Sequence, residues 1–156
     1  MVAKKKEVVL KFTVAEIAKA RKKLTQADAS VDSAEVMHLM PFLTPVERIN
    51  FVNELHRVMK KGAKCQLVSP HWSSSRAYAD LRFQWPPVVE GWYYNLNTDF
   101  RKQDPGGDKR YTCNFDVTWG YSLHPHLNTR NQEYQQHAVT FWKEAAQDLA
   151  ATIIKK

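Results

Sequence analysis

The sequence is poor in cysteine and has no long apolar segment. Of its 156 residues only Cys65 and Cys113 are cysteines, and their spacing fits no metal-binding or redox motif. We find neither a secretory signal pattern nor an apolar run of about 18 residues, which a membrane-spanning helix requires. These absences argue against a disulfide scaffold, a cysteine-built metal site and a membrane partner. They predict a soluble protein of the cytoplasm, where thiols stay reduced.

Positive charge exceeds negative charge, with 23 lysine and arginine residues against 16 aspartate and glutamate residues and a net charge of +7. The lysines concentrate at 4–6, 21–23, 60–61 and 155–156. Because lysines at chain ends and on helix faces usually serve solubility, the charge supports nucleic-acid binding only weakly. The chain length and a hydrophobic content of 44% predict one domain over residues 1–156.

The amino-terminal segment predicts a strand that leads directly into a helix. "EVVLKF" at 7–12 is rich in β-branched residues, which favour strands. Thr13 and Glu16 then have the spacing of a capping box, which predicts a helix that ends near Leu24.

A strand–helix–strand unit follows. We expect strands at 33–37 and 63–69 and a helix at 45–59, which begins after Thr44 and is ended by Gly62. The crossover rule makes these two strands parallel neighbours, so their carboxyl ends meet at one edge of the sheet. Ligands of α/β proteins bind at that edge.

The remainder of the chain is less regular. A Pro-Pro and a Gly-Gly pair interrupt regular structure over 81–107. Alternation of apolar and polar residues predicts a strand over 111–123. A helix over 129–150 and a short final strand over 151–156 complete the prediction.

Six segments of the chain stand in a distinctive order: "ADASVD", "ERINFVNELHRVMKKGAK", "SPHWSSSRAYAD", "WPPVVE", "YYNLN" and "AAQDLAATIIKK". In this order and spacing they resemble the second half of small class I S-adenosylmethionine-dependent methyltransferase-like proteins of viral and environmental type. The resemblance covers residues 27–156, and residues 1–26 form a divergent strand–helix segment. It implies an α/β fold with an incomplete Rossmann-like methyltransferase sheet of mostly parallel strands and an antiparallel carboxyl-terminal strand. It also implies S-adenosylmethionine as the cofactor.

Two motifs of that family are kept in part. Relatives carry His-x-x-Glu-His after the fourth strand, and here His38 matches the first histidine while Pro41 and Phe42 stand at the Glu and His positions. Relatives also carry Asp-Pro-Thr-His before the Pro-Pro turn, of which Asp80 is kept.

The cofactor side of the family pattern is missing. A class I enzyme needs a glycine-rich turn after its first strand and an acidic residue about 20 positions further on. The first 26 residues contain no glycine, and the turn after the first predicted strand reads Phe12, Thr13, Val14. A backbone amide approaches a cofactor closely only where no side chain intrudes. The cofactor-binding residues therefore stay unassigned, and we expect the chain alone to hold the cofactor poorly.

The segment "PHWSSSR" at 70–76 predicts a site, because it follows a buried strand with polar and aromatic residues. Following the resemblance, we assign orienting or catalytic roles to His38, Asp80 and Glu90. Acceptor-binding roles go to a larger set: His71, Trp72, Ser73, Arg76, Trp85 and Tyr93. No metal ligand set is expected, since His124 and His126 have no third ligand nearby.

Each of these residues also has a purely structural interpretation. His38 fits a hydrogen-bonded histidine at a strand end, Trp72 fits an anchor of the loop, and Arg76 with Asp80 fits a helical ion pair. A triad of Ser73, His71 and Asp80 is conceivable, but no Gly-x-Ser-x-Gly turn presents the serine.

Two functions therefore remain open. The first is a methyltransferase whose cofactor pocket is completed by a second subunit, and the second is a non-catalytic methyltransferase-like binding protein. In either case the strand at 33–37 would have a bare edge, which invites pairing. We expect the strand at 7–12 to cover that edge, assisted by a homodimer.

Overall fold

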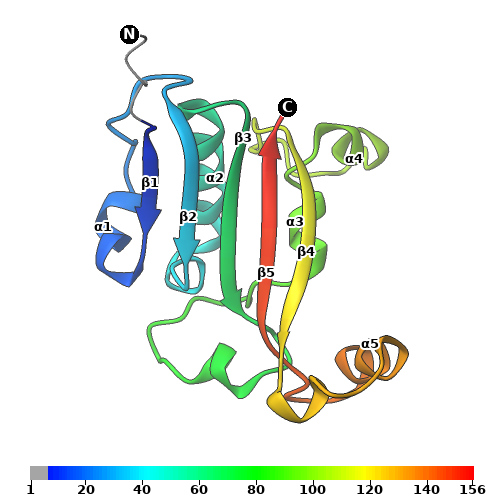
Figure 1. Ribbon diagram of the computed structural model, residues 1–156. Coiled ribbons are helices and arrows are strands. Elements are labelled where there is room, and N and C mark those ends of the chain that lie inside the picture. Colours follow the sequence, from blue (N-terminus) through cyan, green and yellow to red (C-terminus); the bar gives the residue numbers. More distant parts are fainter. Residues whose placement is uncertain (1–6) are drawn as a thin grey trace, which may run out of the picture.

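A computed structural model of the chain describes residues 7–156 and contains one five-stranded sheet (Figure 1). The lysine cluster at 4–6 lies outside the described residues. The strands lie in the order β1 (Val9–Phe12), β2 (Val31–Met37), β3 (Met59–Pro70), β5 (Ala146–Lys155) and β4 (Phe115–Leu123). β1, β2 and β3 are mutually parallel, and β5 runs antiparallel to both of its neighbours. The predicted fold class is confirmed.

The unit β2–α2–β3 forms as predicted, with parallel neighbouring strands and helix α2 (Pro45–Val58) between them. The Thr44 hydroxyl accepts a hydrogen bond from the Glu47 amide, and the Glu47 carboxylate accepts one from the Thr44 amide. The prediction for Gly62 was wrong. The helix ends at Val58, and Gly62 lies inside β3 with φ 78°, where the pairing of β2 with β3 shifts register. An irregular strand uses glycine here because other residues avoid positive φ.

The amino-terminal strand pairs in parallel with β2, so the edge of β2 is covered within the chain. The capping box of Thr13 and Glu16 is present, but the predicted helix to Leu24 is too long. Only a 3-10 turn (Val14–Glu16) and the four-residue α1 (Ile17–Ala20) form. Leu24 is held in another conformation, because its amide donates to the Glu54 carboxylate and its carbonyl accepts from the Arg57 guanidinium.

The carboxyl-terminal helix is also shorter than predicted, because α5 spans Gln132–Phe141 and β5 already begins at Ala146. The alanines of "AAQDLAA" favour a helix in isolation. In the fold, Leu149, Ala151 and Ile153 alternate toward the core, and β5 bonds to strands on both sides. These tertiary contacts override the local helix preference.

The segment over 81–107 is more regular than predicted, because it contains α3 (Glu90–Tyr94) and α4 (Thr98–Gln103). The Asn97 side chain accepts from the amides of Asp99 and Phe100, which starts α4. The strand predicted from residue 111 begins at Phe115.

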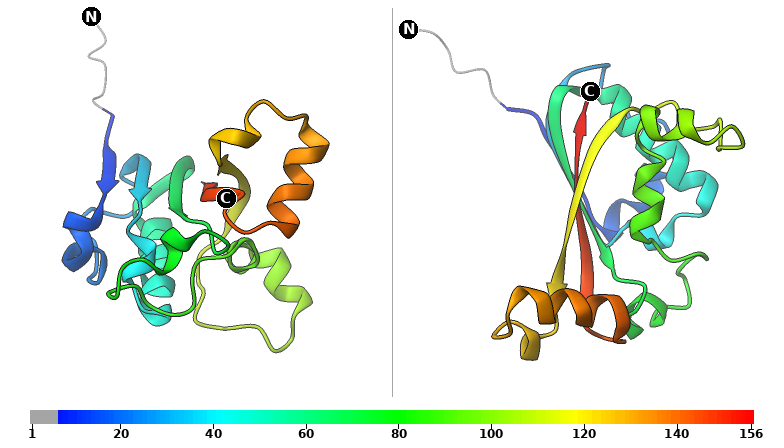
Figure 2. Two further views of the ribbon diagram at one scale, coloured as in Figure 1. Left: turned by 90° about the horizontal axis from the view of Figure 1, so that it is seen from below. Right: turned by 90° about the vertical axis from the view of Figure 1, so that its right-hand side faces the viewer.

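The two faces of the sheet differ. Helices α2 and α3 lie on one face, over a core that includes Val36, Leu67 and Ala151 (Figure 2). Among residues 7–156, no helix covers the opposite face above the level of α5, as the right-hand view of Figure 2 shows. That face is largely polar, and Lys11 forms an ion pair of 3.2 Å with Glu35 on it. No helix within the described part of the chain has the length and apolar character needed to cross a bilayer.

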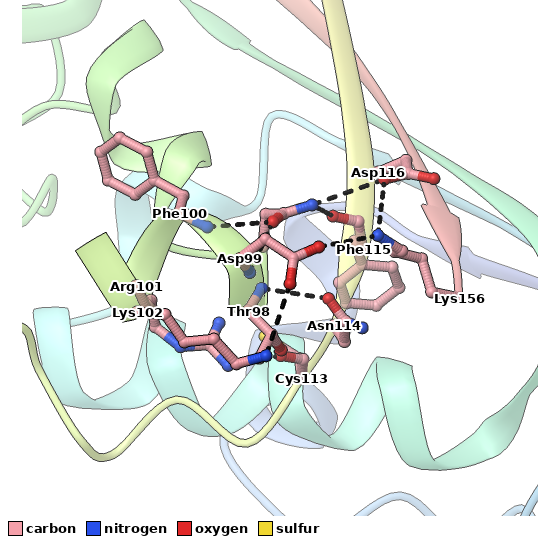
Figure 3. Close-up of polar contacts among 11 residues, drawn as sticks. Thr98, Asp99, Phe100, Arg101, Lys102, Cys113, Asn114, Phe115, Asp116 and Lys156 are labelled. Atoms are coloured by element: carbon pink, nitrogen blue, oxygen red, sulfur yellow. Dashed lines mark hydrogen bonds and ion pairs between the residues drawn. The ribbon is translucent and has the colours of Figure 1, made fainter. Parts of the chain in front are cut away.

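At the amino end of the parallel strands, polar side chains bind one another (Figure 3). The Lys156 ammonium lies 3.3 Å from the Asp99 carboxylate and 3.5 Å from that of Asp116. The Thr98 amide donates to the Asn114 side chain at 3.0 Å. These contacts attach α4 to the ends of β4 and β5.

Candidate functional site

The loop that follows β3 at the carboxyl end of the parallel strands carries a buried hydrogen-bonded chain of side chains. His71 is fully buried, and its Nδ1 lies 2.8 Å from Ser73 Oγ. Its Nε2 lies 2.8 Å from Glu90 Oε1, which also accepts from the Tyr121 hydroxyl at 3.0 Å. The loop after β3, helix α3 and strand β4 thus each supply part of the chain of contacts Ser73–His71–Glu90–Tyr121.

The contacts of Glu90, Tyr121 and His71 determine where these side chains hold their protons. Burial raises the pKa of Glu90, but hydrogen bonds from His71 and Tyr121 outweigh it and hold that pKa at about 2. Burial and the nearby Glu90 charge raise the pKa of Tyr121 to about 12. The Ser73 amide donates to His71 Nδ1 at 3.2 Å, so Nδ1 is an acceptor and Nε2 carries the proton that binds Glu90. The site therefore holds a carboxylate, a neutral phenol and an oriented imidazole.

The arrangement of Ser73, His71 and Glu90 has the residue types of an acyl-transfer triad, with Glu90 where we had considered Asp80. Acyl transfer also needs backbone amides that point at the developing oxyanion. Here the Ser73 amide binds His71 Nδ1, and the Ser74 amide binds the His71 carbonyl at 2.9 Å. The Ser75 amide donates to Glu144 at 2.6 Å. These donors are already used within the chain, so the geometry does not favour acyl transfer.

His38 and Arg76 meet at Asp148, the third residue of β5. Arg76 Nη1 lies 3.0 Å from one Asp148 oxygen, and His38 Nδ1 lies 3.9 Å from the other. His38 has φ 55°, and its amide donates to the Val68 carbonyl at 2.8 Å. The His71 amide in turn binds the carbonyl of Gln147, next to Asp148. The residues that follow β2 and β3 are therefore at one edge, as parallel strands require.

Asp80 and Trp85 lie in a separate group of contacts. The Asp80 carboxylate binds the Arg82 guanidinium at 2.6 Å, and this hydrogen bond lowers the pKa of Asp80 to about 2. Asp80 and Trp85 line a pocket of about 230 Å³ beside Tyr78, and Trp85 is 76% exposed. Tyr93 is fully buried, and its hydroxyl has no hydrogen-bond partner among the described residues.

Arg48 was not predicted as part of this region. It is only 4% exposed and binds three carbonyl oxygens, those of Met40 at 3.0 Å, Gln84 at 2.9 Å and Pro86 at 2.5 Å. Burial lowers the pKa of Arg48 to about 10. The guanidinium thus attaches the loop around Trp85 to the start of α2. Its place one residue before Ile49, on the apolar stripe of the helix, was the available signal.

The turn after β1 is the one that the sequence resemblance would assign to a glycine-rich cofactor loop. The Thr13 amide donates to Glu16 Oε2 at 2.6 Å, and the Ala15 amide donates to Thr13 Oγ1 at 3.3 Å. Phe12 before the turn is fully buried against Phe51. These amides are therefore already satisfied and the turn carries side chains, so the described residues do not fit S-adenosylmethionine here.

No protein-family model matches the sequence, and no curated protein matches it. Solved structures do match in fold. An S-adenosylmethionine-dependent methyltransferase from Archaeoglobus fulgidus aligns at TM-score 0.59 and 17% identity, over 89% of this chain and 64% of that one. The chain thus spans less than two thirds of the length of that protein.

Two further structures give the same result. A methyltransferase from Thermotoga maritima aligns at TM-score 0.50 and 14% identity, over 99% of this chain and 84% of that one. A methyltransferase in complex with a Haloferax volcanii methyltransferase activator aligns at TM-score 0.50 and 12% identity, over 87% and 58%. Residues 7–156 therefore have the Rossmann-like fold of S-adenosylmethionine-dependent methyltransferases.

Proposed function

We propose that this chain is a methyltransferase-like binding protein that keeps the acceptor end of the fold and does not hold S-adenosylmethionine by itself. The observation that carries the proposal is the capping box after β1, which uses the amides of Thr13 and Ala15. A ligand that needs those amides would have to displace two hydrogen bonds of the chain.

The ligand would bind at the rim that follows β3. In this proposal Glu90 and His71 orient its polar group through Ser73, and Trp72 and Arg76 form the rim. His38 would act from the end of β2 through Asp148, which it shares with Arg76.

Asp80 and Trp85 would contact the ligand from the neighbouring loop, which Arg48 holds in place. Tyr93 would act only indirectly, because its side chain is fully buried.

A calorimetric titration of the chain with S-adenosylmethionine and with S-adenosylhomocysteine tests the proposal. We expect no binding heat for either compound at concentrations where the Archaeoglobus fulgidus enzyme, as the positive control, is saturated. Saturable binding of either compound by the isolated chain would falsify the proposal.

A second candidate is methyl transfer in an assembly, with the cofactor pocket completed by another polypeptide. It is favoured by the fold and by the Haloferax volcanii complex, in which a methyltransferase binds an activator. Methyl transfer needs mainly proximity and alignment of the two reactants, which an assembled pocket would provide. If a second copy completes the pocket, cofactor affinity should rise steeply with protein concentration. A titration repeated across a concentration series measures this.

We also propose that the chain forms a homodimer through the sheet edge, where β1 has a strand neighbour on one side only among residues 7–156. Sedimentation velocity of the full chain should then show a dimer that a proline at Lys11 weakens, because proline removes the backbone donor. A monomer at all concentrations would contradict this.

A further inference from the structure

A pocket of about 420 Å³ opens between the loop that follows β3 and the end of α5. Two stretches that are far apart in the sequence, 72–78 and 139–143, form its walls. The lining residues are Trp72, Ser73, Tyr78, Val139, Thr140, Phe141, Trp142 and Lys143. Ser73 links this pocket directly to the buried His71 and Glu90.

The walls of this pocket carry large aromatic side chains that are exposed. The exposed fractions are 41% for Trp72, 53% for Tyr78, 70% for Phe141 and 43% for Trp142. Four exposed aromatic side chains around one hollow form an apolar patch of the kind that marks a binding site. Flat aromatic side chains on opposite walls suit a flat ring between them.

The two walls are fixed to each other by Glu144. Its carboxylate accepts from the Ser74 hydroxyl at 3.0 Å and from the Ser75 amide at 2.6 Å, and its amide donates to the Ser73 carbonyl at 3.1 Å. Glu144 has φ 64°, a conformation that residues other than glycine rarely adopt. Trp142 is held from behind by Tyr134, with ring centroids 5.3 Å apart. The pocket is therefore built before a ligand arrives.

The charge of the lining selects the sign of the ligand. Lys143 is the charged residue among those that line the pocket. The neighbouring Glu144 carboxylate interacts with the Lys143 charge, but it binds Ser74 and Ser75 and is not among the described residues that line the pocket. Aromatic side chains can form a cage for a cationic ligand, but the positive charge of Lys143 would repel such a ligand here. An ammonium beside aromatic faces instead suits a ring that carries an anionic group.

We propose that this pocket binds a planar heteroaromatic ring with an attached anionic group, as in a purine mononucleotide. The ring would stack on the aromatic walls, and the phosphate would bind the Lys143 ammonium. This inference rests on the proposed function, because it names the class of ligand that the rim takes.

Titration of the full chain with adenosine 5′-monophosphate, followed by tryptophan fluorescence and calorimetry, tests the inference. We expect Phe141→Ala to weaken binding about tenfold, as is typical for loss of one stacking partner. Lys143→Gln should weaken the nucleotide about tenfold and leave adenosine unchanged, since adenosine has no phosphate. Phe100→Ala, which removes an exposed aromatic side chain from α4 at the other end of the sheet, serves as the matched control for Phe141→Ala and should bind like the wild type.

Three outcomes would overturn the inference while the chain remains folded in thermal melts. They are absence of binding by the nucleotide, equal affinity for adenosine and the nucleotide, and tighter binding of choline than of the nucleotide. The proposed function fails separately, through binding of S-adenosylmethionine that Phe141→Ala leaves intact. The two failures are therefore distinguishable.

Discussion

The two ends of the sheet are organised differently. At the amino end, charged side chains pair with one another, as Lys156 does with Asp99 and Asp116 (Figure 3). At the carboxyl end, aromatic side chains are exposed around pockets, and His38 and Glu144 both have positive φ. Exposed aromatic side chains that gather around pockets are typical of a binding site. The charged side chains at the amino end thus attach α4 to the sheet, whereas the aromatic side chains at the carboxyl end are accessible to a ligand.

The largest expected effect concerns β1, the four-residue strand that pairs with the outer edge of β2. Removal of residues 1–24 takes Leu10 and Phe12 from the core and leaves the β2 edge without a partner. An unpaired apolar strand pairs with other chains, so we expect aggregation. Light scattering and thermal melts measure this. A soluble, monomeric and cooperatively folded product would mean that the sheet does not need β1 for its stability or solubility.

The next largest effect is expected from Arg48→Met. The variant leaves the carbonyls of Met40, Gln84 and Pro86 without their donor, and buried unsatisfied groups cost about 3 kcal/mol in total. Urea unfolding measures the loss. Arg110→Met is the control, because Arg110 is exposed and pairs with Asp108 in an exposed loop, and its melting temperature should stay within error of the wild type. Equal loss in both variants would mean that the contacts of Arg48 with the three carbonyls do not stabilise the fold.

A smaller, pH-dependent effect is expected from Glu90→Gln. The pKa of Glu90 in the fold, about 2, lies below its ordinary value of 4.5. The ionised carboxylate therefore stabilises the fold above pH 4.5, and this contribution is lost as the pH falls from about 4.5 to about 2. At neutral pH we expect the variant to lose about 1–2 kcal/mol of unfolding free energy. The loss is limited because Glu90 is partly exposed and solvent screens its charge. The difference in unfolding free energy between wild type and variant should shrink across that pH window. A difference independent of pH would exclude this role for the carboxylate.

The smallest effect compares strained positions at the two ends. Ala29, near the amino end, has φ 48°, and Ala29→Gly should stabilise the chain by about 1 kcal/mol because glycine adopts this conformation without strain. Glu144→Gly relieves similar strain but removes the hydrogen bonds to Ser74 and Ser75. We therefore expect no gain in melting temperature there. A gain for Glu144→Gly as large as that for Ala29→Gly would mean that the hydrogen bonds of the Glu144 side chain to Ser74 and Ser75 do not stabilise the chain.

The parts of the fold that the sequence predicts well depend on short-range signals. The capping box at Thr44 and the apolar stripe of α2 predict the helix, and the crossover rule then makes β2 and β3 parallel. The same rule brings His38 and His71 to one edge, and Asp148 bridges His38 to Arg76 there. These inferences need no knowledge of distant residues.

The parts that the sequence does not predict depend on long-range contacts. The strand β5 has a helix-like composition and forms only because β3 and β4 bind both of its edges. Likewise, Glu90 becomes the partner of His71 through the path of the loop between them, which no local pattern specifies. An arginine on a helix is usually a surface residue, and Arg48 is buried because the loop at 84–86 packs against it.

The position of β5 between β3 and β4 has a consequence for biosynthesis. Within the described part of the chain β4 pairs with β5 alone, so on the ribosome β4 has no such partner until residues 146–155 have left the exit tunnel. The unit of β1, β2, α2 and β3 can form earlier, since domains fold from the amino terminus as they emerge. During the interval the nascent chain presents the unpaired edges of β3 and β4 together, which is the period in which a holding chaperone would have most to bind.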